Sequence, residues 1–291
     1  MRPQVSSKPA GRAASGGQTG VYRSGHDPNL AWPVLSWRTL RRDVYRTALK
    51  TGVLQCGVYL EEPLQAGRPT VVFIHGALAA PSQFAELAPA LSDGVNRAAF
   101  LWDDGARLTP TAEHLRAALL RLPGAVAIVA HSMGMLLPAY VGATDVHGLL
   151  RDVAAVYLNP LIGGSRYAGD FRALRWLRLG SVLQRAFCRA SILDLAPESA
   201  FQQTICGLAS APSSFAPRTV LLFTERIGQE PDIRPARVPH YFGRSREELV
   251  ARFGRALRLP EASASDHNAP LRKPNLVLPI LEALLDRRAA G

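Results

Sequence analysis

Cysteine is scarce in this sequence of 291 residues, which holds only Cys56, Cys188 and Cys206. Three cysteines at wide spacing exclude a disulfide framework and match no zinc-binding pattern. Such usage is typical of reduced thiols, so we expect a cytoplasmic protein. A chain of this length also buries a large enough core to fold without disulfides or a structural metal ion.

Long apolar runs are absent as well. The longest runs, such as residues 125–130, fall far short of the roughly 20 residues that a membrane-spanning helix needs. No apolar segment follows the first arginine in the manner of a secretory signal. Hydrophobic residues make up 47% and charged residues 20% of the chain, a balance that excludes wholesale disorder. We therefore expect one large globular domain or two small ones.

Positive charge is unevenly distributed along the chain. The net charge is +11, and residues 1–46 and residues 172–189 carry all of this excess, since the other segments are neutral in sum. Neither patch accompanies a nucleic-acid recognition motif, so we expect no nucleic-acid partner. The favoured interpretation of residues 172–189 is an amphipathic helix with solvated arginines. The alternative is contact with an anionic lipid surface or with the phosphate of a carrier-bound acyl chain.

Strand and helix patterns alternate from about residue 51 onward. Short apolar runs predict strands at residues 52–60, 70–74, 98–102, 125–130, 153–158, 220–223 and 257–261. Helical spacing predicts helices at residues 83–91, from 109 to 122, from 132 to 140, after Ser245 with its capping box to Glu248, and at 276–285. Strands alternating with helices require crossover connections. We therefore predict an α/β fold with a doubly wound, mainly parallel sheet and helices on both faces.

The domain organisation follows from composition and spacing. Residues 1–45 are predicted to be a basic, largely disordered N-terminal extension, from which Trp32, Trp37 and Leu40 dock onto the body. Residues 46–291 are predicted to form the sheet domain. Residues 161–217 separate two predicted strands and show helical patterns. That stretch is too long for a plain connection, so we interpret it as a helical insertion.

The sharpest local signal is Ala130-His131-Ser132-Met133-Gly134, which directly follows one predicted strand and precedes a helix. This is the context of a nucleophile elbow, a tight turn whose small flanking residues let the serine hydroxyl rise above the sheet edge. The turn also aims the Met133 N–H at the same space, at a helix N-terminus that favours developing negative charge. We predict Ser132 as a nucleophile and assign no role to His131.

Two further segments complete the pattern. His75-Gly76-Ala77 follows the strand at 70–74, and its loop can supply a second oxyanion N–H, from Ala77 rather than Leu78. His75 itself is interpreted as a structural hydrogen-bonding residue. Asp266-His267-Asn268 follows the last predicted strand. It returns His267 to the same edge of the sheet, where the imidazole can act as general base and then as general acid.

At these three points the sequence resembles the α/β-hydrolase superfamily, and within it the serine lipases and esterases, over roughly residues 51–288. The resemblance implies Ser132 as nucleophile, His267 as base and residues 161–217 as a lid, because this family inserts its cap between those two strands. It implies a carboxylic ester hydrolase that forms an acyl-enzyme on a small-molecule or lipid ester. Neither a cofactor nor a metal is implied.

The carboxylate that orients His267 has several candidates. Asp232 is favoured because it precedes Val238-Pro239, as such acids in this family often precede a Val-Pro pair. Glu225, nearer the strand end, is the second choice, and Asp170 and Asp194 are further candidates. Asp266 is adjacent to His267, and neighbouring side chains diverge. Geometry and not spacing identifies a triad.

Two alternative functions stay open. A thioesterase or acyltransferase would use the same residues on a thioester, or with an acceptor other than water. A non-catalytic lipid-binding protein with the hydrolase fold would have no carboxylate within hydrogen-bond reach of His267.

Overall fold

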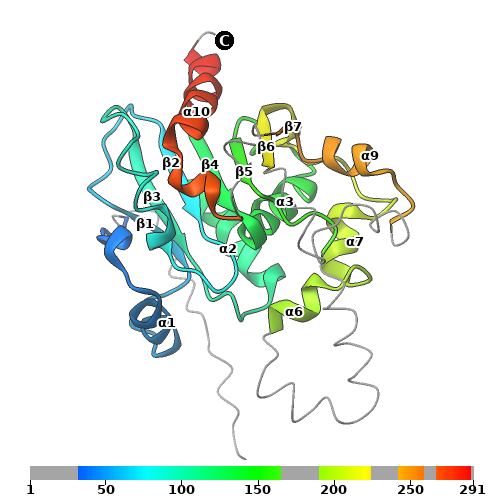
Figure 1. Cartoon of the computed structure of the whole chain (residues 1–291), viewed down its shortest axis with the longest axis horizontal. Helices are drawn as coiled ribbons and strands as arrows, with labels where there is room; N and C mark the ends of the chain where they lie inside the picture. The colour runs from blue at the N-terminus through cyan, green and yellow to red at the C-terminus, as the bar shows by residue number, and fades with distance from the viewer. Residues whose placement is uncertain (1–31, 165–189, 224–241, 259–266, 290–291) are drawn as a thin grey trace, which may run out of the picture. The chain divides into compact units, whose positions relative to one another are not determined.

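The structure, a computed structural model, describes residues 32–164, 190–223, 242–258 and 267–289 (Figure 1). These residues form a seven-stranded sheet in the order β1-β3-β2-β4-β5-β6-β7. The strands are β1 (Gly57–Leu60), β2 (Thr70–Ile74), β3 (Asn96–Leu101), β4 (Val126–His131), β5 (Ala154–Leu158), β6 (Thr219–Phe223) and β7 (Arg255–Arg258). Neighbouring strands are parallel except that β1 runs antiparallel to β3. The predicted mainly parallel α/β sheet is confirmed.

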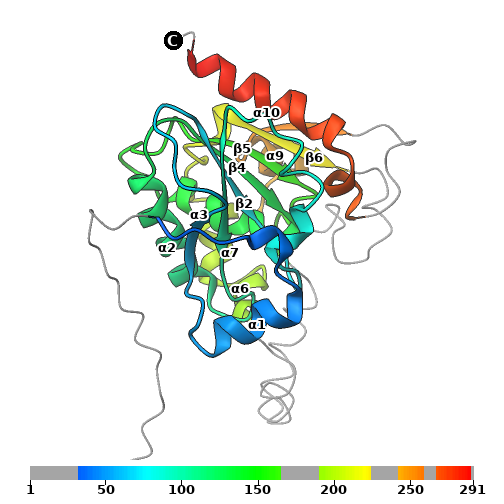
Figure 2. The same cartoon turned by 90° about the vertical axis from the view of Figure 1, so that its left-hand side faces the viewer.

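Helices cover both faces of this sheet (Figures 1 and 2). The α-helices among the described residues are α1 (Arg42–Lys50), α2 (Leu108–Arg121), α3 (Leu136–Ala143), α6 (Ala190–Leu195), α7 (Ala200–Cys206), α9 (Arg246–Ala251) and α10 (Pro274–Ala289). Helices α2, α3, α7 and α9 share one apolar core with the sheet. Helices α1 and α10 pack into the other core. Figure 2 shows the strands lying between α10 and the pair α2 and α3.

The central strands are buried on both faces, which explains their continuous apolar sequences. In β2, Val72 and Ile74 point into one core, whereas Val71 and Phe73 point into the other, as the two-residue repeat of a strand requires. Because the central strands are parallel, their carboxyl ends meet at one edge. The loops that leave β2, β3, β4 and β5 therefore converge there, and this edge carries the candidate site.

Local structure differs from the sequence pattern at one predicted helix. Residues 83–91 form only a short 3-10 turn, η2 (Pro81–Phe84), followed by further turns. Their apolar side chains Phe84, Leu87 and Leu91 are nevertheless buried in the core, so the spacing indicated the buried face but not the backbone. The predicted capping box is confirmed, because Ser245 and Glu248 exchange hydrogen bonds at the start of α9.

The described chain begins within the segment predicted as an N-terminal extension. Trp37, in the 3-10 turn η1 (Trp37–Thr39), is completely buried, and Tyr45 of α1 is buried as well. Residues 32–45 therefore pack on the sheet domain, as expected for Trp37, while residues 1–31 lie outside the described residues.

The predicted insertion at residues 161–217 is described in part. Its described portion contains α6 and α7. Phe201 and Ile205 of α7 enter the core beside α3. All five arginines of the 172–189 segment lie outside the described residues, and so does Cys188. Cys56 and Cys206 are free thiols. None of the helices in the described ranges has the length and apolar character needed to cross a membrane.

Candidate active site

Ser132 occupies a strained turn at the carboxyl end of β4. It is the first residue of the 3-10 turn η3 (Ser132–Met135), and its φ angle is +51°. A non-glycine residue in this left-handed region costs on the order of 1–3 kcal/mol and persists only where the surrounding structure holds it. The Ser132 side chain is partly exposed, whereas Met133 and Gly134 are buried. This conformation is the one that presents a serine hydroxyl above a sheet edge.

The end of β2 packs directly onto this turn. A methyl group on Gly134 would collide with the carbonyl oxygen of His75 and come within 2.8 Å of the carbonyl oxygen of Ile74. A methyl group on Gly76 would lie 3.1 Å from the Cβ atom of Ser132. The turn at residues 130–134 and the loop at residues 75–78 are thus in contact, and the predicted need for a small residue at position 134 is confirmed.

His75 anchors the loop at residues 75–78. Its ring is buried and stacks on Trp102 with ring centroids 5.3 Å apart. Burial lowers the pKa of His75 to about 4, so the ring is neutral near pH 7 and carries one proton. Nδ1 of the ring lies 2.9 Å from the Gly76 carbonyl oxygen, and Nε2 lies 2.8 Å from the Tyr45 hydroxyl oxygen, which itself donates to the Trp102 carbonyl oxygen at 2.8 Å. The interpretation of His75 as a structural hydrogen-bonding residue agrees with these contacts.

A carboxylate from the neighbouring strand end holds the next part of this loop. Leu78 has a φ angle of +57°, and its N–H donates to the carboxylate of Asp104. Burial raises the pKa of Asp104. Because the Leu78 N–H is engaged in this way, Ala77 stays our candidate for the oxyanion donor from this loop. Asp104 lies in the turn that follows β3, and nothing in its local sequence indicates its distant partner Leu78.

The structure places His267 at the carboxyl ends of β4 and β5. The His267 carbonyl oxygen accepts a hydrogen bond from Asn159 Nδ2 at 2.6 Å and lies 3.1 Å from His131 Nε2. The His267 and His131 rings are in contact, with centroids 4.7 Å apart. His131 directly precedes Ser132, so the return of His267 to this edge agrees with the sequence prediction. The sequence pattern indicates no role for His131 and gives no signal at Asn159.

One of the acid candidates has a different role. Asp194 is buried and accepts hydrogen bonds from the Leu108 N–H (2.7 Å) and from Arg107 Nε (3.1 Å), with a further ion pair to Arg107 Nη2 (2.9 Å). These contacts place its carboxylate at the first turn of α2, where unpaired N–H groups and the helix dipole favour a negative charge. Asp194 therefore links α6 to α2. The other candidates, Asp232, Glu225 and Asp170, lie outside the described residues, as does Asp266.

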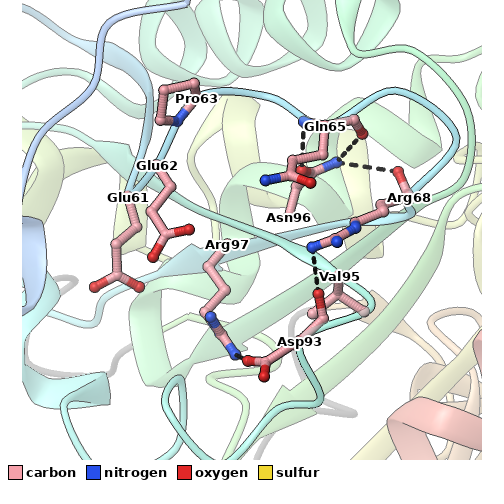
Figure 3. A pocket seen from close by; sticks show the side chains of 9 residues that line it. All are labelled: Glu61, Glu62, Pro63, Gln65, Arg68, Asp93, Val95, Asn96 and Arg97. Carbon is pink, nitrogen blue, oxygen red and sulfur yellow. Dashed lines mark hydrogen bonds and ion pairs between the residues drawn. The ribbon is translucent and has the colours of Figure 1, made fainter.

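A polar pocket lies at the opposite end of the sheet, beside Asn96 at the start of β3 (Figure 3). Its groups mainly bond to one another: Arg97 pairs with Asp93 at 3.3 Å, and Asn96 donates to the carbonyl oxygens of Gln65 and Arg68. Its volume of about 110 Å³ is well below the roughly 300 Å³ at which small-molecule sites begin. This pocket is therefore not a second candidate site.

Comparison with known proteins identifies the family. The model of the alpha/beta hydrolase family matches residues 71–280, and the chain belongs to this family. No curated protein matches the sequence significantly.

Several solved structures share the fold. The type II thioesterase BorB from the borrelidin biosynthetic cluster is 15% identical, with 80% of this chain and 97% of that chain covered and a TM-score of 0.51. The thioesterase domain from the curacin biosynthetic pathway is 13% identical, with 79% and 100% covered and a TM-score of 0.50. The mature lipase BlEst2 of Bacillus licheniformis is 18% identical, with 78% and 97% covered and a TM-score of 0.48. At these identities the likeness concerns the fold alone.

Proposed function

We propose that this alpha/beta hydrolase cleaves carboxylic esters of apolar acyl chains through an acyl-enzyme on Ser132. The observation that carries the proposal is the left-handed Ser132 at the end of β4, in contact with the Gly76 loop. Such a strained serine beside a backbone loop is the arrangement that acyl transfer needs. The position of His267, held by its carbonyl oxygen next to the residue that precedes Ser132, supports the same reaction.

The reaction proceeds in two halves. In the first, His267 takes the proton of the Ser132 hydroxyl as the oxygen attacks the ester carbonyl carbon, and the N–H groups of Ala77 and Met133 stabilise the oxyanion. The intermediate then collapses, and His267 gives the proton to the departing alcohol. In the second half, His267 takes a proton from water, which attacks the acyl-enzyme. Collapse of that second intermediate releases the carboxylic acid and restores the Ser132 hydroxyl.

Two parts of the proposal rest wholly or partly on segments outside the described residues. Asp232 is our candidate for the carboxylate that orients His267, with Glu225 as the next choice. Residues 161–217 are proposed to act as a lid. For the arginines at 172–189, a solvated face of an amphipathic helix stays the favoured interpretation, and contact with an anionic lipid surface or with the phosphate of a carrier-bound acyl chain stays the alternative. We also propose that the protein is cytoplasmic, as expected from its cysteine content.

Labelling with a fluorophosphonate probe tests the proposal. We would compare the native protein with Ser132→Ala and His267→Ala by intact mass. Ser92→Ala is the matched control, because Ser92 is exposed and directly precedes Asp93, which lines the pocket at the opposite end of the sheet. We expect a single label on the native protein and on Ser92→Ala, none on Ser132→Ala and much slower labelling of His267→Ala. A native protein that stays unlabelled, or a label that persists in Ser132→Ala, contradicts the proposal.

A series of substrates then distinguishes an esterase from a thioesterase or an acyltransferase. The native enzyme, free of the fluorophosphonate, would be assayed on matched esters and thioesters of increasing acyl length. Higher kcat/KM on the ester at each acyl length supports the proposal. Preference for the thioester, or transfer to an added alcohol in place of water, would move the assignment to a thioesterase or an acyltransferase.

A further inference from the structure

The carbonyl oxygen of His267 lies against two polar side chains from different strand ends. Asn159, directly after β5, donates its Nδ2–H over 2.6 Å, and Nε2 of His131, the last residue of β4, lies at 3.1 Å. Both side chains belong to buried residues, His131 with 3% and Asn159 with 1% of its surface exposed. A carbonyl oxygen has two lone pairs, so it can accept both hydrogen bonds at once. The carbonyl oxygen of His267 is therefore held from two sides.

The protonation of His131 follows from its surroundings. Burial and the neighbouring His267 lower the pKa of His131 to about 4, so the ring is neutral near pH 7. The single proton belongs on Nε2, because that atom faces the His267 carbonyl, whereas Nδ1 is buried without a hydrogen-bond partner among the described residues. A proton on Nδ1 would bury an unpaired donor and leave two acceptors facing each other, both of which are costly.

Asn159 is itself rigidly placed. Its φ angle is +44°, a conformation that asparagine tolerates better than most residues. Its backbone N–H donates to the Leu222 carbonyl of β6 at 2.8 Å. The amide that contacts His267 is thus tied to the sheet through β5 and β6, while His131 is tied to it through β4. Because these strands are central and buried, the two donors form a rigid platform.

We propose that His131 and Asn159 are positioning residues which hold His267 within proton-transfer distance of Ser132. This inference rests on the proposed function of Ser132 and His267. A general base works when its nitrogen lies within about 3.2 Å of the proton donor, and a displacement of about 1 Å costs roughly a hundredfold in rate. His131 is also bonded covalently to Ser132, which it directly precedes, and it reaches His267 through the contact to the His267 carbonyl oxygen. A shift of the turn at residues 130–134 therefore shifts the His267 loop with it.

Paired variants test this role. His131→Gln keeps an N–H donor at nearly the reach of Nε2, and His131→Leu removes it. Asn159→Gly removes the second donor and suits the positive φ angle. We expect His131→Leu and Asn159→Gly to lower kcat by about tenfold or more, with KM nearly unchanged and His131→Gln retaining most of the native kcat. All rates would be normalised to the fraction of active enzyme, so a loss of folded protein does not register as a loss of kcat.

A measurement on the native protein makes the test independent of the variants. The ¹⁵N and ¹³C chemical shifts of the His131 ring at pH 7 report which nitrogen carries the proton. We expect the Nε2–H form. The Nδ1–H form overturns the inference, as does a native kcat in both His131→Leu and Asn159→Gly. These outcomes differ from failure of the proposed function, in which the native protein itself would not react with the fluorophosphonate.

Discussion

Gly134 lies directly beneath the end of β2, where an added methyl group would come within 2.8 Å of the Ile74 carbonyl oxygen. This contact allows the strained turn at Ser132 to sit against the loop at residues 75–78. We expect Gly134→Ala to lower the free energy of unfolding by about 1–3 kcal/mol through overpacking, and to slow fluorophosphonate labelling. Gly57→Ala is the matched control, because nothing lies within 4 Å of its added methyl. Urea unfolding measures both variants, and equal stabilities would contradict the expected close packing.

The Tyr45 hydroxyl joins α1 to the loop at residues 75–78. It lies 2.8 Å from His75 Nε2 and accepts from the Trp102 N–H at 2.8 Å. Tyr45→Phe leaves these two buried groups without that partner, so we expect a loss of about 1–3 kcal/mol in unfolding free energy. Tyr59→Phe is the control, because the Tyr59 hydroxyl accepts a solvent-exposed hydrogen bond from the Gln55 N–H. A loss in Tyr45→Phe no larger than in the control would show that the buried network is not stabilising.

We expect removal of the Asp194 carboxylate to change stability, and removal of the Asp232 carboxylate to change kcat. Asp194→Asn weakens the contacts at the start of α2, so we expect a loss of about 1–2 kcal/mol in stability and a kcat near the native value for the folded fraction. Asp232→Asn is expected to lower kcat by about four orders of magnitude, as loss of a triad carboxylate does, with little change in stability. Steady-state kinetics beside urea unfolding separate the two effects. The reverse pattern would make Asp194 the triad acid.

Two buried histidines are expected to make stability depend on pH. Burial lowers the pKa of His75 and of His131 from 6.5 to about 4. Above pH 6.5 neither the folded nor the unfolded chain protonates them, so their contribution to stability is fully present. Between pH 6.5 and about 4 only the unfolded chain takes up these protons, so the free energy of unfolding falls as the pH falls. We expect a loss on the order of 2 kcal/mol per histidine between pH 7 and pH 5.

Urea unfolding at pH 7, 6 and 5 checks this expectation. His75→Gln removes one titrating group, so its unfolding free energy should fall less steeply than that of the native protein over this range. His147→Gln is the control, because His147 is exposed. The same slope for His75→Gln and the native protein would show that His75 does not titrate as its burial implies.

Much of the fold follows from patterns that act over a few residues. The runs at residues 71–74 and 125–130 are continuously apolar and short, as strands buried on both faces of a sheet are. The capping box at Ser245 acts within one helical turn. The run at residues 83–91 was misleading, since the same spacing of Phe84, Leu87 and Leu91 also suits a sequence of turns. Periodicity reports which side chains are buried and not the hydrogen bonds of the backbone.

In the candidate site, too, some residues could be predicted from the sequence and others could not. Ser132 could be predicted because a strand, a tight turn and a helix are consecutive in the chain, and His75 and His267 follow strands of the same sheet. The roles of Asp194, Asp104 and Asn159 could not, because each depends on a partner more than 20 residues away in sequence: Leu108, Leu78 and His267. Only the packing of the chain brings such partners together, since a carboxylate or an amide in a loop has no sequence neighbour that determines what it bonds.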